Sequence, residues 1–168
     1  DQAVLKDRDN ELQDFIRDQL DVDGAFLSLK GKNALNQKAS VEKIIQERFK
    51  LLGKDIEPRI LQKWKEVANT RINSALGRID SHSRTQTDFY YNNVSDSRIK
   101  GAVFDVISNH TNAPIRDKYI QFGLNEIDQK LERSLGILPG TQDEDEIATR
   151  RDAHLQFTSA AHSGVVEK

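Results

Sequence analysis

Residues 61–89 read LQKWKEVANTRINSALGRIDSHSRTQTDF, a run whose apolar positions recur every three or four residues. That spacing places the apolar side chains on one face of an α-helix and leaves the polar side chains between them toward solvent. We expect this face to pack against other helices as a seam. The predicted seam comprises Leu61, Trp64, Ala68, Ile72, Ala75, Ile79, His82, Gln86 and Phe89.

The same stripe continues beyond residue 89, less regularly, as far as Ile107. A periodic run much longer than about 25 residues is typical of a coiled-coil-like helix rather than a compact bundle. We predict that this helix begins near Asp55, with Pro58 in its first turn, where proline removes no hydrogen bond. The polar run 92–97 could break it, but we expect the helix to continue through.

Four further helices are predicted on either side of the long one. They cover residues 3–20, 33–52, 114–135 and 142 to the end, and we expect residues 26–29 to form a loop packed on the helices. For the last helix, Thr141 and Glu144 have the spacing of a capping box. The face that we expect to be buried there consists of Ile147, Ala148, Arg151, His154, Leu155 and Ala161. The fold class is therefore all-α: an elongated array or bundle of about five helices, including one of unusual length.

Composition limits the classes of function. The 168 residues carry 25 basic and 27 acidic side chains, and this balance disfavours nucleic acid as the main partner because duplex-binding domains usually show a basic excess. The chain has no cysteine, and no apolar run approaches the about 18 residues of a membrane span. We expect one helical module over residues 1–168, cut from a longer polypeptide, because a helical pattern already runs at its first residues.

No residue pattern points to catalysis, to a metal or to another cofactor. His154 and His162 lie eight residues apart, which is too far along one helix to grip a single ion. His82 and Gln86 occupy seam positions although both are polar. We expect them to form a polar layer inside the seam, hydrogen-bonded to neighbours, which fixes the register of the helices.

One family resemblance adds to this interpretation. The segment Arg71-Ile72-Asn73-Ser74-Ala75-Leu76, followed by His82, Gln86 and Ser95-Asp96-Ser97-Arg98-Ile99, resembles a helical region of large tailed-bacteriophage virion proteins. These include internal, ejection-type proteins, some of which carry a lytic transglycosylase domain elsewhere. The resemblance spans about residues 7–168. It implies a virion structural segment without an active site of its own.

We therefore expect a non-catalytic component of a phage or prophage virion, acting through helix-mediated assembly with other virion proteins or with copies of itself. It would reside in the particle, or in the host cytoplasm during assembly. Two alternatives remain open at this point. One is a bacterial helical adapter or scaffold that binds a protein partner, and the other is an accessory domain of a cell-wall-cleaving enzyme.

Overall fold

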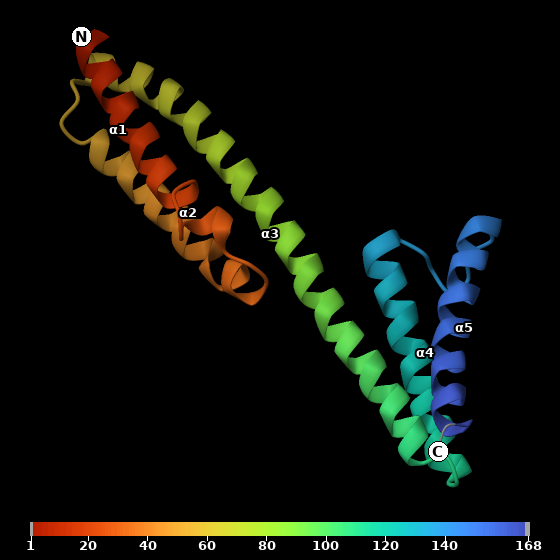
Figure 1. Cartoon of the computed structure of the whole chain (residues 1–168). Helices are drawn as coiled ribbons and strands as arrows, with labels where there is room; N and C mark the ends of the chain where they lie inside the picture. The colour runs from red at the N-terminus through yellow and green to blue at the C-terminus, as the bar shows by residue number, and fades with distance from the viewer. Residues whose placement is uncertain (1, 167–168) are drawn as a thin grey trace. The chain divides into compact units, whose positions relative to one another are not determined.

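The computed structural model describes residues 2–166, and within them every regular element is helical (Figure 1). In chain order these are α1 (Gln2–Leu20), the short 3-10 helix η1 (Phe26–Ser28), α2 (Lys32–Leu52), α3 (Pro58–Ser108), α4 (Ala113–Leu135) and α5 (Glu144–Val166). The all-α class and the single long helix are thus confirmed. None of the helices in the described part is long and apolar enough to cross a lipid bilayer.

Helix α3 runs without a break for 51 residues, including the polar run 92–97 that could have ended it. It starts at Pro58, three residues later than the predicted Asp55, and the Glu57 carbonyl accepts its first hydrogen bonds. Its contacts divide the chain into two compact units, where the sequence suggested one module. The first unit extends to Thr87 and the second begins at Asp88, so each unit uses a different part of α3.

The first unit packs α1 and α2 against the N-terminal part of α3 around Trp64, whose side chain is fully buried. The Phe49 ring of α2 lies 6.2 Å from the Trp64 ring. Burial of such large apolar side chains is the main force that holds helices together in water. The buried cluster consists of Leu12, Ile16, Leu20, Phe26, Val41, Ile45, Leu52, Ile56, Ile60, Trp64, Ala68, Ile72, Ala75 and Ile79.

The second unit combines the C-terminal part of α3 with α4 and α5 around a much smaller apolar cluster. Ala102, Ile127 and Phe157 are its buried members, one from each helix. Around them lie the partly buried Ile99, Val103, Ile120, Leu124, Leu131 and Ala153. Because this core is small, the second unit depends more on polar contacts between helices, which are described below.

Local sequence signals explain where α4 begins and ends. The Asn112 side chain accepts a hydrogen bond from the backbone N–H of Ile115, so it caps the first turn. At the other end Gly136 adopts a left-handed conformation with φ of 70°, and its N–H and that of Ile137 return to the last turn. This is the Schellman arrangement that glycine favours.

Two expectations for α5 need correction. The cap is Asp143 and not Thr141: the Asp143 carboxylate accepts the N–H of Glu146 at 3.0 Å, while the Thr141 hydroxyl donates to the Glu146 side chain. The buried face was also misassigned. Ile147, Arg151 and Leu155 are exposed, whereas Phe157, which the pattern did not single out, is buried and Ala161 remains buried as expected.

Candidate functional site

The predicted seam on α3 lies mostly against α1 and α2. Trp64, Ala68, Ile72, Ala75 and Ile79 are buried, and Leu61 is half-buried beside them. The seam does not reach its last predicted member, because Phe89 is 50% exposed. Phe89 belongs to the second unit, beyond the part of α3 that α1 and α2 cover.

His82 and Gln86 contact the loop between η1 and α2 and not each other. The His82 Nε2 atom lies 2.8 Å from the backbone oxygen of Leu29, so Nε2 carries the proton because a carbonyl can only accept. One turn along α3, the Gln86 Oε1 atom accepts the backbone N–H of Gly31 at 2.7 Å. Gly31 needs its positive φ of 54° to lead into α2.

A third side chain on the same row of α3 extends this contact. Arg78 forms an ion pair with Asp21, at the end of α1. Residues four apart share one face of a helix, so Arg78, His82 and Gln86 form a straight polar row. The Phe26 ring of η1 also meets the His82 ring edge-on at 5.3 Å. This row fixes the loop onto α3, which is a structural role.

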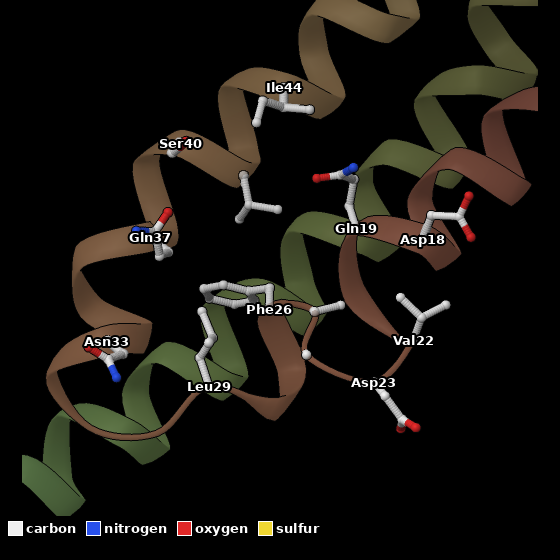
Figure 2. A pocket seen from close by; sticks show the side chains of 13 residues that line it. Asp18, Gln19, Val22, Asp23, Phe26, Leu29, Asn33, Gln37, Ser40 and Ile44 are labelled. Atoms are coloured by element: carbon white, nitrogen blue, oxygen red, sulfur yellow. The ribbon is translucent and has the colours of Figure 1, made fainter.

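The same loop forms one wall of a recess of about 530 Å³ between the end of α1 and α2 (Figure 2). The close-up shows Phe26 and Leu29 at its base and the amide of Gln19 extending toward α2. The carboxylates of Asp18 and Asp23 point outward instead. The interior of the recess is therefore lined by apolar side chains and amides. The carboxylates of Asp18 and Asp23 point away from it and could not contact a molecule bound inside.

In the second unit, Asp128 of α4 joins two basic side chains of α5. Its carboxylate accepts Arg150 Nε and Nη2 at 2.9 and 3.0 Å and His154 Nε2 at 2.6 Å. Burial raises the pKa of Asp128, but the hydrogen bonds from Arg150 and His154 outweigh it and leave the pKa below its usual value. The same carboxylate raises the pKa of Arg150. This arrangement ties α5 to α4.

Glycine lets the two helices approach closely next to that contact. A Cβ atom built on Gly123 of α4 would lie 2.1 Å from Cζ of Phe157, which is far inside van der Waals contact. The ring of Phe157 therefore occupies the space that any other residue at position 123 would need. A glycine inside a predicted helix, as at Gly123, is a sequence signal that could have indicated this close contact.

Polar side chains join α3 to α4 through the run that could have broken α3. Lys130 Nζ lies 2.5 Å from Asp96 Oδ1, and Arg133 Nη2 donates to the hydroxyl of Ser95 at 2.8 Å. One turn away, Ser134 donates to Asn92 at 2.9 Å. These residues are polar because they form a hydrogen-bonded helix interface and not because the helix ends there.

An open groove of about 550 Å³ runs along the second unit between α3 and α5, with α4 at its base. Its apolar lining is Ile99 and Val103 from α3, Ile127 and Leu131 from α4, and Ala153, Phe157 and Ala160 from α5. The charged residues that line it are Asp96, Lys100 and Lys130. Exposed apolar surface of this kind often marks a binding site for another protein.

No group of three or more potential metal-binding side chains converges anywhere in residues 2–166. His154 is engaged by Asp128, and His82 by the backbone of Leu29. Comparisons with protein families, with characterised proteins and with solved structures found no match to this chain. The geometry and the sequence therefore carry the functional argument by themselves.

Proposed function

We propose that this chain is a non-catalytic structural module that works by helix-mediated association with other proteins, as part of a phage or prophage virion protein of the internal or ejection type. The groove of the second unit carries the proposal. It exposes apolar side chains from three helices, among them Val103 of α3, Leu131 of α4 and Ala160 of α5. Water contact with so much apolar surface is unfavourable, and a protein partner would relieve it.

The use of the polar side chains supports association over catalysis. General acid–base chemistry needs a group free to exchange a proton with a substrate. His82 instead holds the loop after η1, and Asp128, Arg150 and His154 hold α5 on α4. Each of these groups is accounted for by a contact between segments of the fold.

The virion assignment has the resemblance around residues 71–76 and 95–99 as its support. A particle protein of this kind would be found in the virion, or in the host cytoplasm while particles assemble. A bacterial adapter that binds a protein partner through the same groove is the second candidate, since an apolar groove serves either class. An accessory domain of a cell-wall-cleaving enzyme is the third.

Localisation separates these candidates. An antibody raised against the chain should label purified particles from the strain that encodes it, after prophage induction or phage growth. Label that stays with cytosolic protein and never enters particles would contradict the virion assignment and favour the adapter. Release of muropeptides from peptidoglycan by the purified chain, abolished by one Asp or Glu substitution, would contradict the non-catalytic role.

A further inference from the structure

A lysine lines one side of the groove in the second unit, and an aspartate lies just beyond its other side. On the α3 and α4 side, Lys100 and Lys130 outnumber the one carboxylate, Asp96, which Lys130 already engages. On the α5 side the surface continues into a shallow area that shares Ala153 and Gln156 with the groove and has Asp152 as its charged residue. Lys100 and Asp152 are both exposed, and neither has an ion-pair partner within residues 2–166.

The α5 side is also shaped for close approach by a helix. Ala153 and Ala160 lie seven residues apart, so they share one face of α5, and both line the groove. Small side chains reduce the distance at which a second helix can pack. The opposite wall is bulkier, with Ile99 and Val103 from α3. Ala153 and Ala160 on one wall and Ile99 and Val103 on the other therefore complement each other in size, and Lys100 and Asp152 add opposite charges in and next to the groove.

A surface whose two halves complement each other suits its own copy. In a twofold dimer both subunits use the same patch, and a contact made once is made again by symmetry. A twofold axis along the groove would place the α3 wall of one copy against the α5 wall of the other. Lys100 would then meet Asp152 of the partner copy in two equivalent places.

We propose that a second copy of this chain docks on the groove of the second unit, with Ile99 and Val103 of each copy against Ala153 and Ala160 of the other and Lys100 opposite Asp152. This inference rests on the proposed function, since it names the surface and the partner for association. The apolar groove supplies the contact area, and the charges select the pairing of walls.

Charge reversal tests the pairing without touching the core. The full chain is studied by sedimentation velocity at low salt, because screening weakens exposed pairs beyond about 10 Å at 0.1 M. The wild type should dimerise as concentration rises between about 1 μM and 1 mM, which covers weak to moderate association. Lys100→Glu and Asp152→Lys should each raise the dissociation constant about tenfold, since two contacts change sign in a twofold interface.

Mixing the two variants gives the sharpest result. Lys100→Glu and Asp152→Lys should form a heterodimer with each other although each self-associates poorly, and the double variant should dimerise like the wild type. Lys118→Glu, on an exposed position of α4 outside the groove, is the matched control and should change nothing. Circular dichroism and melting should show that all variants remain folded.

Three outcomes would overturn the interface: a wild type that stays monomeric throughout, single variants that associate like the wild type, or a mixture that fails to pair. A monomer whose groove instead binds an amphipathic helix of another protein also overturns it. The proposed function is judged separately. A monomer found in particles would refute the dimer alone, whereas a dimer absent from particles would refute the virion role alone.

Discussion

Adding one methyl group at Gly123 should destabilise the second unit, although the same change usually stabilises a helix. Alanine in a helix interior is about 0.5–1 kcal/mol more favourable than glycine. At Gly123, however, the new Cβ atom would lie 2.1, 2.5 and 2.7 Å from three atoms of the Phe157 ring. The Phe157 ring is rigid and only 4% exposed, so it can relieve the clash only by leaving its buried position toward the groove that it lines. Overpacking of this kind costs about 1–3 kcal/mol and occasionally more.

Gly101→Ala provides the matched control. Gly101 is also inside a helix of the second unit, and a Cβ atom there would meet nothing within 4 Å. Both substitutions gain the same helix propensity, so the difference between them isolates the clash. We expect Gly101→Ala to stabilise the second unit by about 0.5–1 kcal/mol. The free energy of unfolding of Gly123→Ala should be about 1–3 kcal/mol lower than that of Gly101→Ala.

Hydrogen exchange of the α4 and α5 backbone is the appropriate measurement, because it reports the second unit directly. The protein's only tryptophan, Trp64, lies in the first unit, so its fluorescence gives an internal comparison that should move less. Adding Phe157→Leu to Gly123→Ala should recover part of the loss, because the shortened side chain makes room, and the double-mutant cycle should show coupling. If Gly123→Ala stabilises α4 and α5 as much as Gly101→Ala does, the close approach of the two helices is wrong.

Substitutions at three other places test the core, the loop after η1 and the ion pair between α4 and α5. Trp64→Ala should lower the free energy of unfolding by about 3–5 kcal/mol, as truncation of a buried large aromatic side chain does. Urea unfolding followed by circular dichroism measures this. A decrease within about 0.5 kcal/mol would mean that Trp64 lies at the surface. His82→Leu and Gln86→Leu should each lower the free energy of unfolding by about 1–3 kcal/mol and speed hydrogen exchange near η1, because the Leu29 carbonyl and the Gly31 N–H lose their partners. Arg84→Leu, at an exposed neighbouring position, is the control. If it has the same effect as the other two substitutions, His82 and Gln86 do not anchor the loop. The pKa of Asp128 is lowered in the folded chain, so its stabilising effect is present above the ordinary carboxyl pKa of about 3.9 and is lost as pH falls through the lowered value. Asp128→Asn should therefore remove that part of the acid sensitivity of α4 and α5. If the stability of the variant depends on pH as that of the wild type does, the prediction is wrong.

Helix boundaries could be predicted from the sequence because their signals are local. Asn112, Pro114 and Gly136 act on the backbone within a turn of themselves, so α4 begins and ends close to where they indicate. The seam of the first unit could be predicted for a related reason. Its stripe is long and strongly apolar, and α1 and α2 carry stripes of their own to meet it.

The buried face of α5 could not be predicted in this way, since it depends on what stands opposite. Leu155 and Phe157 are both apolar, and the three- and four-residue spacing from Ile147 favoured Leu155, which is exposed. Gly123 on α4 decides between them by leaving room for a ring, and the carboxylate of Asp128 draws Arg150 and His154 to the same side. The partners of His82 and Gln86 could not be predicted for a similar reason. Both side chains have hydrogen-bond partners, as expected, but these partners are backbone atoms of a loop 53 and 55 residues away in sequence.

The two units differ in the size of their apolar cores, and this difference bears on function. In the first unit a large apolar core supplies most of the stability, and the interhelical ion pairs Arg71–Asp9 and Lys38–Asp80 add to it. In the second unit the core is small, and polar contacts from α4 to α3 and to α5 supply a larger share of the contacts that hold the helices together. Polar interfaces specify which helices pair, yet each contact adds little net stability. The second unit therefore has most to gain from covering its groove, so association should stabilise α4 and α5 more than α1 and α2.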